Sequence, residues 1–222
     1  MKKIENKFTV SRETIARLKV YEESLKDWQT KMNLVSSSSL GNAWQRHFED
    51  SVQLLDLLPS GARTLYDFGT GAGFPGMVLA IMAQEQLPEL KVTLVESTAK
   101  KTLYLKHVAE LTGAKVTIIN DRIENLKPAK VDVITSRALA SLDKLLNYSK
   151  PLCRPDTVLI FPKGQSHQAE IAEAKKNWSF DIEIYASRSS NEGAILLITN
   201  LKPKQKYSNH GQRTRITNTI KE

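Results

Sequence analysis

Residues 66–76, YDFGTGAGFPG, decide how the rest of the sequence is interpreted, because four glycines here separate two apolar segments. The last six residues fit G-x-G-x-x-G, the pattern of dinucleotide-binding loops. Gly69, Gly71 and Gly73 also form G-x-G-x-G, with Asp67 two residues before them. Glycines between a strand and a helix let a ligand approach the backbone closely. The stretch therefore predicts a ligand-binding loop, and its ligand is either a dinucleotide or another molecule that carries a ribose.

After Gly61, short apolar strands alternate with helical segments. We expect strands at 64–68, 91–97, 115–120, 131–138, 157–164, 180–187 and 194–201. We expect helices at 75–84, 99–113, 141–150 and 168–178. This alternation predicts an α/β, Rossmann-like fold, with a mostly parallel sheet and helices on both faces. In such sheets the ligand binds at the carboxyl ends of the strands, where the glycine loop lies.

The segment before the first strand is expected to be helical. Residues 11–30 carry apolar side chains at helical spacing, with Ser11 placed to cap the helix. The four serines 36–39 predict a loop, and residues 42–58 predict a second helix. We therefore expect an N-terminal helical cap at 1–60, a Rossmann-like core at 61–201 and a basic, flexible tail at 202–222.

The composition and net charge of the chain indicate which classes of partner to expect. The 222 residues carry a net charge of +8, and the isoelectric point is about 9.5, which suits a polyanionic partner such as nucleic acid. A merely basic, soluble protein is the plainer interpretation. The N-terminus does not resemble a signal peptide, no apolar run could span a bilayer, and no Cys/His cluster has metal-ligand spacing. A cytoplasmic protein without a metal site or membrane partner is expected.

Two acidic residues bear on the ligand of the glycine loop. A carboxylate at Asp67 would repel a pyrophosphate and favour a cationic ligand such as S-adenosylmethionine, which has no phosphate. Glu96 ends the next strand, where a carboxylate would hold the ribose hydroxyls of either cofactor. The plainer interpretations are a loop-capping Asp67 and a solvated Glu96. These residues favour a methyltransferase over a nicotinamide-dependent oxidoreductase, and no Gly-Lys-Ser/Thr of a P-loop follows.

Further motifs run through the chain in a fixed order: NLVSSSSLGNAWQRHFEDS before the loop, then VESTAKKTLYLKHV, NDRIE, TSRALASL and FPKG. With FGTGAGFPG, they make residues 33–201 similar to the bacterial ribosomal RNA small subunit methyltransferase G family, also called glucose-inhibited division protein B. The resemblance implies a class I S-adenosylmethionine-dependent methyltransferase fold. It also implies methylation of N7 of one guanine in 16S rRNA, at position 527 in the loop of helix 18. The tail lacks the lysine- and proline-rich motif that closes many members.

The resemblance carries over cofactor contacts in four places: the glycine loop, the acidic turn at the ribose, the pair beside the adenine, and an arginine beside cofactor and target. Together with the other loop residues, the expected cofactor-binding residues are Asp67, Gly69, Gly71, Gly73, Phe74, Glu96, Ser97, Thr98, Ile123, Glu124 and Arg137.

Guanine N7 is a bare lone pair, so its methylation needs positioning and no general base. The residues expected to position the reactants are Arg137, Lys163 and Arg122, and those expected at the RNA substrate are Asn33, Arg46 and His47. Four of these residues have a plainer alternative. For Arg137 it is a salt bridge to Glu124 or Asp67, for Lys163 and Arg122 solvent exposure, and for His47 simple packing.

The partner implied is 16S rRNA, within the small ribosomal subunit or an assembly intermediate, and the protein is expected to be a monomer. Because the A-form major groove is too narrow for side chains, the guanine must lie in an exposed loop or be flipped out. Two other classes stay open at this point. One is a non-catalytic RNA-binding or ribosome-assembly protein, and the other is the nicotinamide-dependent oxidoreductase.

Overall fold

The strands form one sheet in the order β3-β2-β1-β4-β5-β7-β6 within the part of the chain that the computed structural model describes, residues 1–3, 9–190 and 192–204. The strands are β1 (Thr64–Phe68), β2 (Lys91–Val95), β3 (Val116–Ile119), β4 (Val131–Ser136), β5 (Cys153–Lys163), β6 (Trp178–Ala186) and β7 (Ala194–Pro203). β1 to β5 are parallel, whereas β7 runs antiparallel to both β5 and β6. The mostly parallel sheet predicted from the alternation is confirmed.

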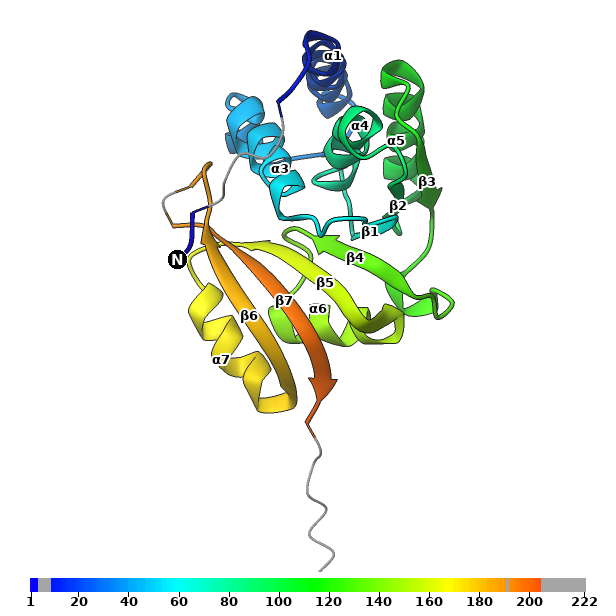
Figure 1. The fold of residues 1–222 in the computed structure, drawn as a ribbon. Coiled ribbons are helices and arrows are strands. Elements are labelled where there is room, and N and C mark those ends of the chain that lie inside the picture. Colours follow the sequence, from blue (N-terminus) through cyan, green and yellow to red (C-terminus); the bar gives the residue numbers. More distant parts are fainter. Residues whose placement is uncertain (4–8, 191, 205–222) are drawn as a thin grey trace, which may run out of the picture.

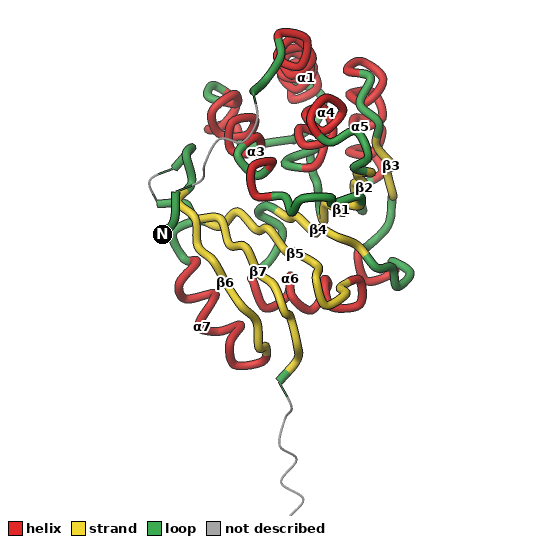
Figure 2. The backbone as a smooth tube through the Cα atoms, in the orientation of Figure 1, coloured by secondary structure: helices red, strands yellow, loops and turns green. Residues whose placement is uncertain are grey.

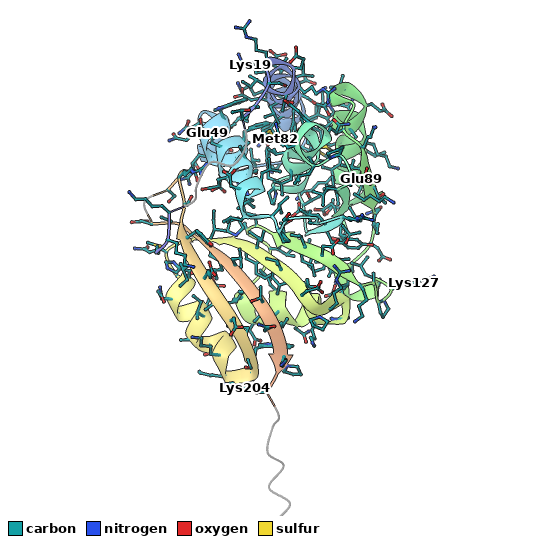
Figure 3. The ribbon with its side chains drawn as sticks, in the orientation of Figure 1. Lys19, Glu49, Met82, Glu89, Lys127 and Lys204 are labelled. Atoms are coloured by element: carbon teal, nitrogen blue, oxygen red, sulfur yellow. The ribbon has the colours of Figure 1, made fainter. Side chains whose placement is uncertain are left out.

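Helices cover both faces of this sheet (Figure 1). One face carries α1 (Arg12–Gln29), α4 (Gly76–Gln86) and α5 (Ala99–Thr112), and the other carries α6 (Leu142–Ser149) and α7 (His167–Asn177). Each face has its own buried apolar cluster. Met82 of α4 is buried between helix and sheet, whereas Lys19 and Lys127 extend outward from the surface (Figure 3).

The first helix forms as predicted. Ser11 caps α1, since its hydroxyl accepts a hydrogen bond from the backbone N–H of Thr14. The buried residues Leu18, Tyr21 and Leu25 recur on one face and belong to the same apolar cluster as the side chains of α4 and α5. The cap therefore packs directly on the core, and the boundary at residue 60 stays a prediction.

The second cap helix forms near its predicted start, but its type and its end differ from the prediction of one helix over 42–58. After α2 (Ser37–Leu40), the helical residues run without a break through the π-helix η1 (Trp44–Glu49) into α3 (Asp50–Val52), and the 3₁₀ turn η2 (Leu55–Leu57) follows (Figure 2). The serines expected in a loop begin the first of these turns. A π-helical turn is wider than an α-helical one and redirects the side chains that follow it.

The C-terminal boundary also differs from the prediction. Lys202 and Pro203, expected in the tail, belong to β7, where they pair with Ser179 and Trp178. The remainder of the predicted basic tail, residues 205–222, lies outside the described residues. Across the described ranges, no helix combines the length and the apolar character needed to cross a bilayer.

Candidate active-site cleft

A cleft of about 1290 Å³ opens at the carboxyl ends of β1, β2, β4 and β5, between the glycine loop, the cap and the β6–β7 connection. We call one part the loop side; its residues are Gly69, Gly71, Glu96, Ser97, Ile123 and Glu124. We call the other part the cap side; its residues are Arg46, His47, Asp50, Arg137, Lys163, Ser187 and Ser189. This is where open parallel sheets bind ligands.

The three alternating glycines of the loop do different work. Gly69 and Gly71 line the cleft, both with φ of +60°, which favours glycine. A Cβ at Gly71 would meet only the Gly69 carbonyl, 3.9 Å away, so the space in front of this residue is open. Gly73 does not line the cleft, and a Cβ there would collide with the hydroxyl of Tyr21. Gly71 thus leaves room for a ligand, Gly69 leaves room for the side chain of Leu139, and Gly73 leaves room for the cap.

The structure places Asp67 inside the protein. Its side chain is fully buried and does not line the cleft. Oδ2 accepts from the backbone N–H of Gly76 at 3.0 Å, and Oδ1 accepts from the Thr135 hydroxyl at 2.8 Å. Burial raises the pKa of Asp67 to about 6, although these hydrogen bonds oppose the rise. The expectation that Asp67 faces the ligand is wrong, because its carboxylate anchors the start of α4, the plainer role weighed from the sequence.

Glu96 is the carboxylate on the loop side. It is buried against the glycine loop, where Oε2 accepts from the N–H of Gly71 at 3.0 Å and Oε1 accepts from the N–H of Thr98 at 2.8 Å. Ser97 lines the cleft beside it, whereas Thr98 begins α5 outside the cleft lining. Each carboxylate oxygen has a second lone pair. A ribose could therefore donate its hydroxyls to Glu96 without breaking these bonds.

The far end of the loop side comes from the turn after β3. Arg122, Ile123 and Glu124 all line the cleft there, joined by Tyr148 from α6. Burial and the neighbouring Glu124 carboxylate raise the pKa of Tyr148. Arg122 and Glu124 are exposed, so the solvent-exposed alternative for Arg122 matches its position. An adenosine fits this donor set: open glycine backbone, a carboxylate for the ribose, and an apolar and an aromatic side chain for the base.

Arg137 is the centre of the cap side. Its Nη1 donates to the backbone carbonyl of Arg46 at 3.0 Å and to Oδ2 of Asp50 at 3.2 Å. Its guanidinium lies 5.2 Å from the centre of the Phe74 ring. A salt bridge was weighed as the alternative role of this arginine, with Glu124 or Asp67 as partner. The ion pair exists, but the acid is Asp50 of the cap.

His47 continues this network on the other guanidinium nitrogen. Its Nδ1 lies 3.0 Å from Arg137 Nη2, and its Nε2 lies 2.9 Å from the Ser39 hydroxyl. An arginine can only donate, so Nδ1 accepts and the proton sits on Nε2. Burial, reinforced by the charge of Arg137, lowers the pKa of His47 to about 4. The imidazole, which stacks on Phe74, is therefore neutral near pH 7.

Lys163 is the last residue of β5 and lines the cap side of the cleft. Its Nζ donates to Oε2 of Glu170 at 2.8 Å and to the Ala140 carbonyl at 2.7 Å. The side chain is only 8% exposed, so the solvated alternative is wrong. Burial alone would raise the pKa of Glu170, but the hydrogen bond and charge of Lys163 lower it below its ordinary value. Through its bond to the Ala140 carbonyl, Lys163 thus holds the loop between β4 and α6 in place.

Arg46 and Asn33, the remaining residues expected at the RNA substrate, lie in different places. Arg46 lines the cleft through its exposed side chain, whereas Asn33 is exposed outside the cleft lining. Sequence reasoning missed Asp50 and the serines of the β6–β7 connection, which also line the cap side. The spacing His47-x-x-Asp50 was a usable signal, because residues three apart share a helical face. Nothing local indicated that Ser187 and Ser189 would reach the cleft.

Comparison with known proteins decides the family. The sequence profile described as rRNA small subunit methyltransferase G matches residues 14–195. The chain belongs to this family. A relative carrying the same name from Rhodospirillum centenum is 42% identical over 197 residues, 89% of each chain. Another from Parvibaculum lavamentivorans is 44% identical over 194 residues, 86% of this chain and 85% of that one. The resemblance seen in the sequence motifs is confirmed.

Solved structures agree on the fold of this family member. The TehB-like SAM-dependent methyltransferase from Corynebacterium glutamicum aligns with a TM-score of 0.53 and 13% identity, over 84% of this chain and 99% of that one. A mutant of MtNAS in complex with S-adenosylmethionine aligns with a TM-score of 0.56 and 16% identity, over 85% and 74% of the two chains. The class I methyltransferase fold is thereby confirmed, and family membership replaces the argument that had rested on Asp67.

Proposed function

We propose that this protein methylates N7 of a guanine in 16S rRNA, the one at position 527 in the loop of helix 18. S-adenosylmethionine is the cofactor of this methyltransferase, and membership of its family makes rRNA the substrate class. When bound, S-adenosylmethionine supplies an electrophilic methyl group on a sulfonium. We assign the loop side to the cofactor and the cap side to the guanine.

One observation carries the choice of N7: the titratable groups of the cap side are already engaged. Both nitrogens of His47 have partners, Asp50 pairs with Arg137, and Glu170 pairs with Lys163. The lowered pKa of His47 also makes its imidazole a weak base. An amine or hydroxyl target would require such a group to accept a proton. Guanine N7 requires none, because its lone pair forms the new bond to carbon.

Arg137 is suited to hold the guanine by its O6 atom. Three of its five N–H donors are committed to Arg46, Asp50 and His47, and no partner for Nε–H or the last Nη2 hydrogen occurs among the described residues. A fork spanning O6 and N7 would occupy the lone pair that must react. We therefore infer that the remaining donors contact O6 and leave N7 free to face the methyl group.

The charge balance of the cap side supports the same assignment. Positive charge moves from the sulfonium to the base as the N7–carbon bond forms and the sulfur–carbon bond breaks, with the bonding pair left on sulfur. An unpaired cation beside the base would oppose this movement. Asp50 compensates Arg137, and His47 is neutral. Beside Arg137, the cap side can thus hold a base next to a cation whose charge is compensated, while Arg46 is exposed to solvent.

The test is methyl transfer from labelled S-adenosylmethionine to small subunits purified from cells that lack this enzyme. The RNA is digested to nucleosides and the label is identified, and the position is mapped by chain cleavage at 7-methylguanosine. We expect one labelled 7-methylguanosine at position 527. Label in another nucleoside would overturn the N7 assignment. Binding to subunits with neither transfer nor cofactor binding would favour the non-catalytic assembly protein, whereas no transfer with intact cofactor binding would mean the wrong substrate state or the wrong RNA. Free 16S rRNA and assembly intermediates, run in parallel, identify the preferred substrate.

A further inference from the structure

Asp50 joins three segments that lie far apart in the sequence. It sits at the junction of η1 and α3, with its side chain 14% exposed at the edge of the cleft. Oδ2 faces Nη1 of Arg137, which follows β4. Oδ1 accepts from the hydroxyl of Ser189 at 2.5 Å and is 3.3 Å from that of Ser187, both in the β6–β7 connection. One carboxylate thus links the cap, the end of the sheet and the loop opposite.

The two oxygens serve different neighbours. On the Oδ1 side, Nε2 of Gln53 also donates at 2.9 Å, so that oxygen holds the loop and the cap together. On the Oδ2 side, the neighbour is the guanidinium of Arg137, itself 17% exposed. Arg137 already lies against Phe74 and His47. Its Nη1 also donates to the Arg46 carbonyl, so Asp50 supplies the charged partner of a group whose other contacts are uncharged.

We propose that Asp50 is a positioning residue for methyl transfer: it fixes the orientation of Arg137 toward the target base and ties the β6–β7 connection to the same point. This inference rests on the proposed function of the cap side. The carboxylate acts through Arg137 and does not touch the reacting atoms. Its contact with Nη1 of Arg137 holds the two remaining guanidinium donors at a fixed angle to the base.

The Asp50→Asn variant separates the contacts of Oδ1 from the contact between Oδ2 and Arg137. Its amide oxygen can keep the Oδ1 contacts with the serines and Gln53, while its amide nitrogen, a donor, is left facing Nη1 of Arg137. Asp50→Glu keeps the charge one methylene farther out and serves as the conservative rescue. Asp156→Asn is the matched control, because Asp156 also pairs with an arginine, Arg154, but is 71% exposed and does not line the cleft.

The first readout is the guanidinium signal of Arg137 in nitrogen-15 spectra of the whole protein, assigned from its disappearance in Arg137→Lys. Held groups rotate slowly and give resolved N–H signals. We expect resolved signals in the wild type, Asp50→Glu and Asp156→Asn, and a single averaged signal in Asp50→Asn. Resolved signals that persist in Asp50→Asn would overturn the proposal, whatever substrate the enzyme uses.

The second readout is a double-mutant cycle on total label transferred to RNA. We expect Asp50→Asn to lower kcat by about 100-fold, with cofactor affinity changed less than about threefold, and Asp50→Glu to lose less than about tenfold. In an Arg137→Ala background, Asp50→Asn should lower kcat by less than about threefold, because the arginine through which Asp50 acts is already absent. Equal losses in both backgrounds would refute action through Arg137.

This design keeps the proposal apart from the proposed function. If the wild type labels a nucleoside other than 7-methylguanosine, the proposed reaction fails, but the cycle still measures whether Asp50 acts through Arg137. If the wild type gives 7-methylguanosine and the cycle is additive, the reaction stands and the role of Asp50 falls. A melting temperature within a few degrees of the wild type shows that a loss of activity in Asp50→Asn is not unfolding.

Discussion

The two sides of the cleft are built in different ways. On the loop side, ligand-facing groups come from consecutive strand ends, and Glu96 is fixed by backbone N–H groups of Gly71 and Thr98. On the cap side, Arg137 is fixed by the cap, and the β6–β7 connection converges on the same carboxylate. The loop side thus draws on neighbouring strand ends, whereas the cap side brings together residues of the cap, the segment after β4 and the β6–β7 connection. Changes on the two sides should therefore fail in different assays.

The largest effect is expected from Gly71→Arg. The residue has φ of +60° and faces open space in the cleft, so an arginine would be both strained and placed where we propose that the cofactor binds. We expect at least a 100-fold loss of S-adenosylmethionine affinity, measured by calorimetry. Gly113→Ala is the control, because Gly113 has φ of +64° at the end of α5, outside the cleft lining. Equal losses in both variants would point to general destabilisation.

Arg137→Ala should break the cap side alone. Under the proposed assignment the target base loses the guanidinium that holds it, and we expect kcat to fall by about 10²–10³-fold with cofactor affinity changed less than about threefold. Single-turnover transfer and calorimetry measure the two quantities. Arg17→Ala, a change at an exposed arginine of α1 that bonds Gln84, should leave both unchanged. A parallel loss of cofactor affinity in Arg137→Ala would extend this arginine's role to the loop side.

Asp67→Ala tests the buried hydrogen bonds that hold the strand β1 to the start of α4 beside the glycine loop. The change removes the acceptors of the Gly76 N–H and the Thr135 hydroxyl in a fully buried place. We expect the free energy of unfolding to fall by about 2 kcal/mol, measured by urea denaturation. Asp67→Asn keeps one acceptor for Gly76 and a donor that the Thr135 hydroxyl can accept, so it should lose less. Equal losses would show that the lost hydrogen bonds are not the cause.

The smallest effect concerns the protonation of His47. Its pKa is lowered from 6.5 to about 4 in the folded protein, so the unfolded chain binds the proton more tightly. The free energy of unfolding should therefore fall as the pH drops from about 6.5 to 4, by on the order of 1–2 kcal/mol from this residue. His47→Gln can keep both hydrogen bonds and should lack this component. Parallel pH profiles of the two proteins would contradict the assignment.

Much of the fold could be predicted from the sequence because its signals are local. The strand and helix alternation after Gly61 gave the parallel sheet, and Ser11 marked the start of α1. The π-helical form of the second cap helix could not be found this way. Phe48 and Trp44 keep a spacing that suits an α-helix as well as a π-helix, and Phe48 packs against Tyr21 and Phe74, which lie far from it in the sequence.

The site shows the same limit. Glu96 and Gly71 follow strand ends, so their meeting was predictable. Asp67 instead lies inside β1, one residue before its end, and its side chain is buried against the start of α4. The pairing of Arg137 with Asp50 joins residues 87 positions apart, and no spacing in the sequence records it.

The contact between Tyr21 and the glycine loop limits how this enzyme can be re-engineered. The Tyr21 hydroxyl donates to the Ala72 carbonyl, its ring stacks on Phe74, and Gly73 leaves it the necessary room. The cap is thus not an exchangeable module. A shortened fragment that begins at residue 61 would lose a supporting side chain of its own cofactor loop. Chimeras with other methyltransferases would have to transplant α1 and residues 69–76 as one unit.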